Sequence, residues 1–312
     1  MSSFNRFKHQ LDSALDLLEN SEQIKQLDLP QVLGAQMVDT ESLLSRCTHI
    51  CDKHKQKKPV IRIVHHLACS GGTLVSKCIS AMPNVYLLSE LHPSTSLDID
   101  LNNPVYKPTD LISLSKYSGI PNQNELTEKL FLNGIKIIHQ HVDERGGILV
   151  LRDHTHADYC TNVPIPQKST LLSLLEQDFD VKSVLTIRDP IDAYASLVKN
   201  NWVHFEPATF DEYCRRVLLL VNSFDMENIF SYQKLTESPL HEMKKLCEAL
   251  DIPFDDSFED TFGIFAVTGD SGRSSNVIGQ RKRMLENDMI DEFKQSENYI
   301  MLINALSKYE IN

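Results

Sequence analysis

The fold is decided by the stretch Val60-Ile61-Arg62-Ile63-Val64-His65-His66-Leu67-Ala68-Cys69-Ser70-Gly71-Gly72-Thr73-Leu74. Its first part is a short apolar run rich in β-branched residues, which is typical of a buried strand. A turn with two glycines follows, and the pattern of residues 74–81 predicts a helix. A strand, a tight glycine turn and a helix direct backbone N–H groups at an anion, and the helix dipole favours its negative charge. We therefore predict a phosphate-binding loop directly after the first strand.

The individual residues of this loop suit an anion. Gly71 and Gly72 carry no Cβ, so the backbone can approach a ligand closely. Ser70 and Thr73 add hydroxyl donors. The Walker A motif of ATPases requires a Lys after its last Gly, and this chain has Thr73 there. The motif therefore argues against an ATPase, and a glycine turn that binds nothing remains an alternative while the motif is taken alone.

Outward from the loop, short apolar runs alternate with helical patterns, which is typical of a parallel sheet. The predicted strands are residues 60–64, 85–88, 148–151, 184–187 and 229–232. An insertion, residues 89–147, separates the second and third strands, and we expect it to be mostly helical and to shape a ligand cleft. The predicted fold class is α/β: a three-layer P-loop-type domain with a central parallel sheet of about five strands flanked by helices.

The chain before this domain has a different character. Residues 1–58 are predicted to form a helical N-terminal extension and residues 59–312 the P-loop-type domain, because a basic stretch meets a proline at their junction. Cys47, Cys51 and His54 fall on one face of such a helix. A zinc site usually adds a second pair of ligands elsewhere, and none is visible in the sequence, so we predict no metal.

The composition narrows the classes of partner. Across 312 residues, 31 Lys plus Arg stand against 43 Asp plus Glu, which gives a formal charge of −12. This acidic balance argues against unspecific binding of nucleic acid or of an anionic membrane, so we expect neither partner. No apolar run approaches the roughly 20 residues of a membrane span, and the N-terminus lacks an apolar signal core. Seven cysteines without framework spacing indicate reduced thiols, and we expect a cytoplasmic protein.

A second motif follows the predicted strand at 184–187 and reads Arg188-Asp189-Pro190-Ile191-Asp192-Ala193-Tyr194-Ala195-Ser196. Together with the first loop it resembles the sulfotransferases that use 3′-phosphoadenosine-5′-phosphosulfate (PAPS). That family carries Lys-Ser-Gly-Thr-Thr after its first strand and Arg-x-Pro-x-Asp-x-x-x-Ser later in the chain. Arg188 and Ser196 match the Arg and Ser of the second motif at the same spacing. By this resemblance, they would hold the 3′-phosphate that distinguishes PAPS from ordinary adenine nucleotides.

Two later segments extend the resemblance to roughly residues 59–285. Tyr232-Gln233-Lys234-Leu235 looks like the family's Tyr-Glu-Asp-Leu strand with its subsequent helix. The run Gly269-Asp270-Ser271-Gly272-Arg273 is similar to the late loop that closes over the 3′-phosphate, which makes Arg273 a candidate ligand. The resemblance thus implies a PAPS site, with PAPS as co-substrate, formed by Cys69, Ser70, Gly71, Gly72, Thr73, Arg188, Ser196 and Arg273.

The chain departs from the family pattern at Cys69, where the family usually has a Lys or Arg that stabilises charge on the leaving phosphate. A thiol supplies no positive charge, and a thiolate would repel a phosphosulfate, so we expect a protonated thiol in the occupied site. The candidates for a substitute cation are Arg152 and Arg273, with Lys77 a weaker third because it lies a full turn into the helix.

Two residues compete for the role of catalytic base. The strand at 148–151 runs into Arg152-Asp153-His154, which looks like the Lys-Thr-His of cytosolic sulfotransferases. By that match, His154 is the base and Arg152 its helper, and a neutral imidazole is a suitable proton acceptor near pH 7. Glu90 follows the strand at 85–88, where the tyrosyl-protein and heparan sulfate branches place a catalytic Glu. The sequence leaves the choice between His154 and Glu90 open.

The expected function is sulfuryl transfer from PAPS, without a metal, to a hydroxyl or amine of a small-molecule or glycan acceptor. The determinants of the acceptor are expected in the insertion and in the loop after His156, which Pro164 and Pro166 stiffen. One alternative is a P-loop nucleotide or small-molecule kinase that uses ATP and Mg²⁺. The other is a catalytically weak nucleotide-binding module, which Cys69 favours. The sequence does not set the oligomeric state.

Overall fold

The computed structural model of the chain describes residues 58–97, 99–269, 278–279 and 287–307. In this part of the chain one parallel sheet has the strand order β2-β3-β1-β4-β5. The strands are β1 (Val60–His65), β2 (Val85–Leu91), β3 (Ile148–Asp153), β4 (Asp180–Ile187) and β5 (Ile229–Ser231). The predicted central parallel sheet is therefore confirmed. The predicted extension, apart from Lys58, lies outside the described residues, so the domain boundary stays a prediction.

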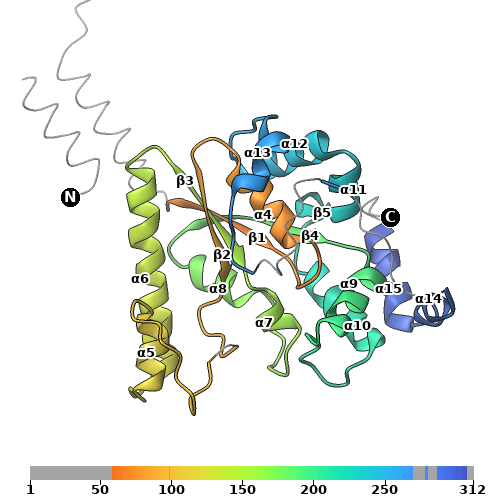
Figure 1. Cartoon of the computed structure of the whole chain (residues 1–312), viewed down its shortest axis with the longest axis horizontal. Helices are drawn as coiled ribbons and strands as arrows, with labels where there is room; N and C mark the ends of the chain where they lie inside the picture. The colour runs from red at the N-terminus through yellow and green to blue at the C-terminus, as the bar shows by residue number, and fades with distance from the viewer. Residues whose placement is uncertain (1–57, 98, 270–277, 280–286, 308–312) are drawn as a thin grey trace, which may run out of the picture. The chain divides into compact units, whose positions relative to one another are not determined.

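Helices cover both faces of the sheet (Figure 1). On one face, Val64 packs in a buried cluster with α4 (Gly72–Ser80), α12 (Pro239–Leu250) and α13 (Phe258–Thr261). On the other, Ile61 and Ile63 pack with α6 (Gln123–Asp143) and α8 (Thr170–Leu175). These three side chains are fully buried and alternate between the faces, as strand geometry requires. The layers are those of the predicted three-layer α/β domain.

A third buried cluster lies at the end of β4 and supports the second motif. Leu185 and Ile187 pack there with the helices α9, α10, α14 and α15. These helices are α9 (Pro190–Lys199), α10 (Phe210–Val221), α14 (Asn287–Phe293) and α15 (Glu297–Ser307). The stacked rings of Phe210 and Phe293, 4.3 Å apart between centroids, join α10 to α14. This packing fixes α9, whose first turn begins where β4 ends.

All five strands differ from the predicted ranges at one end, and two of these differences have a clear cause. β4 begins at Asp180, four residues before the predicted start, because its polar first residues pair with β1, where Val60 lies opposite Asp180. Pairing, rather than apolar character, therefore sets the start of this strand. The predicted strand 229–232 is wrong at its end, since Tyr232 opens the helix α11 (Tyr232–Glu237). Ser231 ends the strand because its side chain caps α11 and accepts a hydrogen bond from the N–H of Lys234 at 3.3 Å.

The insertion is only partly helical. It contains α5 (Leu111–Tyr117) and the long helix α6, but the described residues of 92–110 form no helix. The prediction of a mostly helical insertion is therefore wrong for its first third, where prolines and polar turns replace an apolar stripe. Three short helices complete the described chain: α7 (His156–Tyr159), η1 (Met226–Asn228) and η2 (Phe262–Ile264). No described helix is both long enough and apolar enough to cross a membrane.

Candidate active site

The candidate site lies where the parallel strands end. The loop after β1 leaves the middle of the sheet, with β3 on one side and β4 on the other. Open α/β sheets bind ligands at this kind of position, outside the carboxyl ends of the strands where the strand order reverses. The ends of β2 and β3 and the residues directly after β3 and β4 supply the remaining predicted residues that the structure describes, so the topology brings distant segments of the chain to one edge.

The phosphate loop has an open helix N-terminus. Gly71 is the N-cap of α4, adopts the left-handed conformation with φ 94°, and provides no side-chain cap. In the described part of the chain, no hydrogen-bond acceptor contacts the N–H groups of Gly71, Gly72 or Thr73. Such N–H groups, with the helix dipole behind them, form an anion site. The loop therefore has the geometry that the sequence predicts for it.

Neither glycine of the loop has room for a side chain. A Cβ on Gly71 would lie 2.1 Å from Cδ2 of Tyr232, and one on Gly72 would lie 2.1 Å from Cδ2 of His66. Both distances are far inside van der Waals contact, so the turn is packed directly on two rings. The left-handed φ of Gly71 adds a second reason for glycine at that position.

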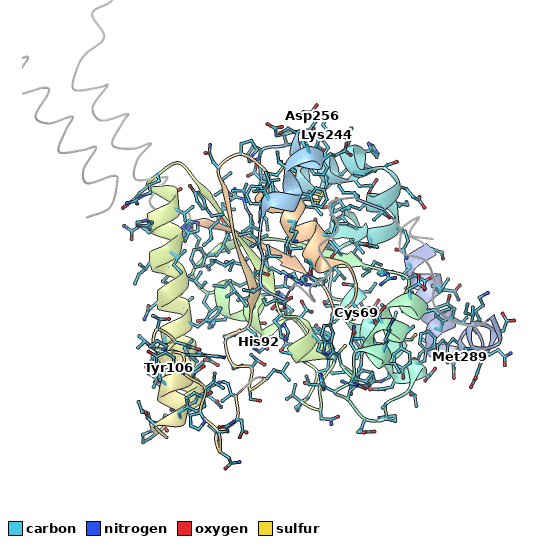
Figure 2. The ribbon with its side chains drawn as sticks, viewed as in Figure 1. Cys69, His92, Tyr106, Lys244, Asp256 and Met289 are labelled. Carbon is cyan, nitrogen blue, oxygen red and sulfur yellow. The ribbon has the colours of Figure 1, made fainter. Side chains whose placement is uncertain are left out.

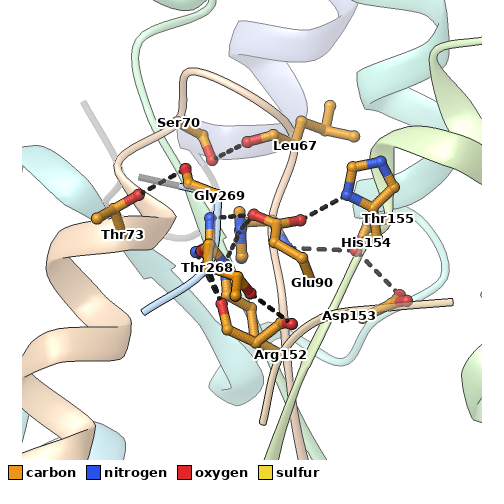
Figure 3. A network of polar contacts seen from close by, with 12 residues as sticks. Leu67, Ser70, Thr73, Glu90, Arg152, Asp153, His154, Thr155, Thr268 and Gly269 are labelled. Atoms are coloured by element: carbon orange, nitrogen blue, oxygen red, sulfur yellow. Dashed lines mark hydrogen bonds and ion pairs between the residues drawn. The ribbon is translucent and has the colours of Figure 1, made fainter. Parts of the chain in front are cut away.

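The other loop residues contact the protein itself. Ser70 is buried, and its Oγ donates to the carbonyl of Leu67 at 2.6 Å, so this hydroxyl closes the turn (Figure 3). The Oγ1 of Thr73 donates to the carbonyl of Gly269 at 3.4 Å. Cys69 has a left-handed φ of 65°, and its Sγ accepts a hydrogen bond from Asn200 at 3.6 Å. The thiol thus lies against the end of α9.

Arg188 of the second motif contacts this loop, and Ser196 lies on the helix α9 that follows it. Nη1 of Arg188 donates to the carbonyl of Cys69 at 3.1 Å, and the guanidinium lies over the ring of Tyr232, 5.7 Å from its centroid. Both motif residues also contact Asp192: Nη2 of Arg188 is 3.9 Å from its carboxylate, and Oγ of Ser196 donates to its carbonyl at 2.8 Å. Arg273 lies outside the described residues.

The two rival bases of the sequence analysis contact each other. Nδ1 of His154 donates to Oε2 of Glu90 at 2.5 Å, and Nη2 of Arg152 contacts Oε1 of the same carboxylate at 2.5 Å (Figure 3). A register shift in β2 next to β3 and a left-handed φ of 59° at Glu90 turn this side chain toward β3. The structure thus brings together all three predicted catalytic residues.

Glu90 is ionised in this setting. Burial alone would raise the pKa of its carboxyl group, but the hydrogen bond from His154 and the charge of Arg152 outweigh burial and hold that pKa well below its usual range. Since the carboxylate accepts the Nδ1–H of His154, the Nε2 of that ring is the nitrogen left to take a proton. Glu90 therefore orients His154 in the way that a carboxylate orients the histidine of a hydrolase triad.

His66 is a member of the site that the sequence analysis missed. Nε of Arg152 donates to Nε2 of His66 at 2.7 Å, so that nitrogen carries no proton and the ring is neutral. Burial, with the charge of Arg152, lowers the pKa of His66 to about 4. The signal in the sequence was its place directly after β1, because β1 pairs with β3 with Val64 opposite Arg152.

A buried network fixes the neighbouring backbone. The carboxylate of Asp153 accepts hydrogen bonds from Nδ1 of His65 at 2.7 Å, from Oγ of Ser169 at 2.7 Å and from Oγ1 of Thr155 at 3.0 Å. The side chains of His65 and Asp153 are fully buried. Since Asp153 lies between Arg152 and His154, this network holds the backbone that carries both.

The segment Thr268–Gly269, called here the strap, crosses the site. The carbonyl of Thr268 accepts hydrogen bonds from Nη1 of Arg152 and from Oγ of Ser89, both at 3.0 Å. Oγ1 of Thr268 donates to the carbonyl of Ser89 at 2.9 Å. Through Gly269 and Thr73, the strap joins the phosphate loop to the Glu90 network (Figure 3). Within the described residues, no group of three or more His, Cys, Asp or Glu side chains is positioned to hold a metal ion.

The comparisons with known proteins agree with this arrangement at the level of the fold. No protein-family model matches the chain, and no curated protein matches it. Among solved structures, the chain is similar to the sulfotransferase domain of the curacin biosynthetic pathway, with a TM-score of 0.50 and 15% identity. That match covers 81% of this chain and 99% of that domain.

Two further solved structures show weaker similarity. One is the sulfotransferase domain of the Synechococcus PCC 7002 olefin synthase, with a TM-score of 0.45, 14% identity, and coverage of 81% of this chain and 96% of that one. The other is the mouse sulfotransferase SULT7A1 complexed with PAP, with a TM-score of 0.41, 16% identity, and coverage of 78% and 88%. From the strand order, the phosphate loop and the curacin match, the chain has a sulfotransferase-like fold.

Proposed function

We propose that this chain is a sulfotransferase that transfers the sulfuryl group of PAPS to a hydroxyl or amine of an acceptor. The observation that carries the proposal is the contact of the Glu90 carboxylate with both His154 and Arg152, in one hydrogen-bonded network with the phosphate loop. A base next to an anion loop is the arrangement that this transfer needs, because the acceptor must lose a proton as it attacks the sulfur.

The residues of the loop and of the second motif fit the two ends of PAPS. The N–H groups of Gly71, Gly72 and Thr73 would bind the 5′-phosphosulfate. Arg188 and Ser196 would bind the 3′-phosphate, because a guanidinium offers a planar fork of donors to phosphate. We also propose Arg273 for the 3′-phosphate on the strength of the family resemblance. In this scheme, the contacts of Arg188 and Ser196 with Asp192 orient both side chains.

In the proposed reaction, the acceptor oxygen or nitrogen forms a bond to sulfur while the bond from sulfur to the bridging phosphate oxygen breaks. The electron pair of that bond stays on the phosphate, so the nucleotide product is 3′,5′-adenosine bisphosphate (PAP). The acceptor proton passes to Nε2 of His154, and the Glu90 carboxylate stabilises the imidazolium that forms. General base catalysis of this kind typically contributes about 10²- to 10⁴-fold in rate.

Because residue 69 is a cysteine, the negative charge on the departing phosphate lacks the basic side chain that usually stabilises it. We propose that the N–H groups of the loop and the dipole of α4 provide most of that stabilisation. Of the candidates for a substitute cation, we propose Arg152, a buried cation in the same network that also holds Glu90 in place.

The test is thermal stabilisation of the full chain by PAP, beside AMP, ADP and ATP with Mg²⁺. At a ligand concentration near 100 times Kd, linkage predicts about 2.7 kcal/mol of added stability, which is a few degrees in a domain of this size. A shift selective for PAP supports the proposal. A shift only with ATP and Mg²⁺ would replace it with the kinase alternative.

A catalytically weak nucleotide-binding module is the second candidate. Two observations favour it: Cys69 supplies no charge, and the strap already occupies donors of Thr73 and Arg152. Tight PAP binding without release of PAP from PAPS over a broad panel of alcohols and amines would select this candidate over the enzyme.

A further inference from the structure

A cavity is formed by the two segments of chain that follow the proposed catalytic pair, Glu90 and His154. It is a cavity of about 310 Å³ lined by residues of two segments, 92–97 after β2 and 157–170 around and after α7. The first segment follows Glu90 and the second follows His154 in the chain. The backbone N–H of His154 donates to the carbonyl of Leu91 at 2.8 Å, so both walls begin at the proposed catalytic pair. His92, on the first wall, lies against α7 (Figure 2).

The floor of the cavity carries a carboxylate with neutral partners. Nδ1 of His92 accepts the backbone N–H of Ser94 at 3.2 Å, so it holds no proton, and Nε2–H donates to Asp158 at 3.1 Å. Asp158 also accepts hydrogen bonds from the N–H of Thr170 at 2.7 Å and from its hydroxyl at 2.6 Å. The side chains of His92 and Asp158 are each 5% exposed. These donors satisfy Asp158 without cancelling its negative charge.

Among the residues that the structure describes, no Lys or Arg lines this cavity. Lys116 donates to the carbonyl of Thr95 at 3.1 Å, so its charge is directed at the backbone of one wall and its side chain is not part of the lining. An anionic group in the cavity would therefore face Asp158 without a compensating cation in the lining. Like charges at close range disfavour binding, and such repulsion is a usual device of specificity.

The walls combine hydroxyl groups with apolar surface. Ser96 contributes a hydroxyl that can donate and accept hydrogen bonds. The Thr95 hydroxyl accepts the N–H of Leu97 at 3.1 Å and can still donate, whereas the Thr161 hydroxyl donates to the carbonyl of Ala157 at 2.7 Å and can still accept. Val163 and Pro164 contribute apolar surface from the loop after α7. A volume of about 310 Å³ is at the small end of ligand pockets, so the cavity suits a single ring rather than an extended chain.

We propose that this cavity binds the acceptor, and that the acceptor is an uncharged, polyhydroxylated molecule of about one ring. The proposal rests on the proposed function, since it assigns the group that attacks sulfur in the reaction written above. The hydroxyl lining matches the donors and acceptors of a polyol, and Asp158 excludes acids. A carboxylated ring of the same size is the class that the site rejects.

The test is saturation-transfer NMR on the full chain with PAP present, using two matched probes. Methyl β-D-glucopyranoside is the neutral probe, and the corresponding methyl glucuronide differs by one carboxylate. We expect transfer to the glucoside and none to the glucuronide. Equal transfer to both probes, or no transfer to the glucoside, overturns the proposal.

Three variants locate the binding. Val163→Trp fills the cavity and is expected to weaken the glucoside signal by about tenfold. Val105→Trp is the matched control, because Val105 is similarly exposed, 47% against 52%, but lies outside the lining. Ser96→Lys places a cation in the lining and is expected to allow transfer to the glucuronide. An unchanged glucoside signal in Val163→Trp, or an equal loss in Val105→Trp, contradicts the assignment.

The same samples separate this inference from the proposed function. Thermal stabilisation by PAP is measured on each variant, none of which touches the phosphate loop. If PAP stabilises every variant but the glucoside pattern fails, the acceptor site is wrong and the proposed function stands. If PAP stabilises none of them while the glucoside pattern holds, the proposed function fails, and the cavity is a polyol site of a protein that does not bind PAP.

Discussion

The two ends of the candidate site differ in how their side chains are held. At the proposed base end, Glu90 lies in β2, Arg152 in the neighbouring β3 and His154 directly after β3, and the Glu90 carboxylate makes short, charge-assisted contacts with the other two. At the nucleotide end, Arg188 and Ser196 come from one strand end and its helix, and they contact carbonyl groups and the more distant carboxylate of Asp192. The proposed base end is therefore set in advance, whereas the donors at the proposed nucleotide end would have to exchange protein partners for a ligand.

The largest expected effect comes from a variant that removes the proposed base, His154, but keeps the hydrogen bond of that side chain to Glu90. In His154→Asn, the amide Nδ2 can still donate to Glu90, but no nitrogen remains to accept a proton. We expect kcat for PAP release from PAPS with methyl β-D-glucopyranoside to fall by about 10²- to 10⁴-fold. Stabilisation by PAP should persist, and His141→Asn, an exposed histidine on α6, serves as the control. Wild-type kcat in His154→Asn would exclude His154 as the base.

The next effect concerns stability at the base end. The pKa of His66 is lowered to about 4 from an ordinary value of 6.5, so the unfolded chain takes up this proton more readily than the folded one. The contribution of the neutral His66 ring to the free energy of unfolding is complete above pH 6.5. As the pH falls toward 4, this contribution decreases by on the order of 3 kcal/mol. His66→Gln keeps an acceptor for Arg152 but does not titrate.

Urea unfolding of the wild type and of His66→Gln between pH 7 and pH 4 checks this prediction. The variant should lose less stability over that interval. His156 also has a lowered pKa, of about 3, and remains in both proteins, so the difference between the two curves isolates His66. Parallel curves would show that His66 is not the neutral, buried acceptor described above.

At the nucleotide end we expect a smaller and more selective effect. Arg188→Ala removes one charged donor of the proposed 3′-phosphate site, and hydrogen bonds to charged groups contribute about 1.5–3 kcal/mol. PAP binding should weaken by about 10- to 100-fold, while AMP, which lacks the 3′-phosphate, should bind as before. Calorimetric titration measures both ligands, and an equal loss for the two would contradict the role of Arg188.

The smallest expected effect concerns the strap, which joins the two ends. Thr268→Val removes the bond from Oγ1 to the carbonyl of Ser89 and leaves the backbone in place. If nucleotide binding displaces the strap from Thr73, this loss of about 1 kcal/mol in the free protein should tighten PAP binding by about fivefold. Weaker PAP binding in the variant would mean that the strap supports the bound state instead.

The parts of this account that the sequence could predict are those with local signals. The β-branched runs predict the strands, and the glycine turn after β1 predicts the uncapped start of α4. The resemblance of the Arg188–Ser196 motif to the sulfotransferase pattern predicts a place near the loop, and the contact of Arg188 with the carbonyl of Cys69 agrees with it. The departure at Cys69 is visible in the sequence for the same reason.

The parts that the sequence could not predict depend on contacts between distant segments. Glu90 contacts His154 because of a left-handed residue in an irregular strand end, and a Glu gives no local signal for that conformation. Tyr232 looks apolar enough to continue β5, but the cap by Ser231 starts a helix there. The strap reaches the site from residues far along the chain, and no periodicity encodes such a path.

The most direct test of the central claim is calorimetric titration of the full chain with PAP and with AMP. The two ligands differ only in the 3′-phosphate. The ratio of their affinities therefore measures the contribution of the proposed 3′-phosphate site at Arg188 and Ser196. The account predicts that PAP binds about 10- to 100-fold more tightly than AMP. Equal affinities, or binding of neither ligand, would contradict the claim that this sulfotransferase-like fold is a PAPS-dependent sulfotransferase.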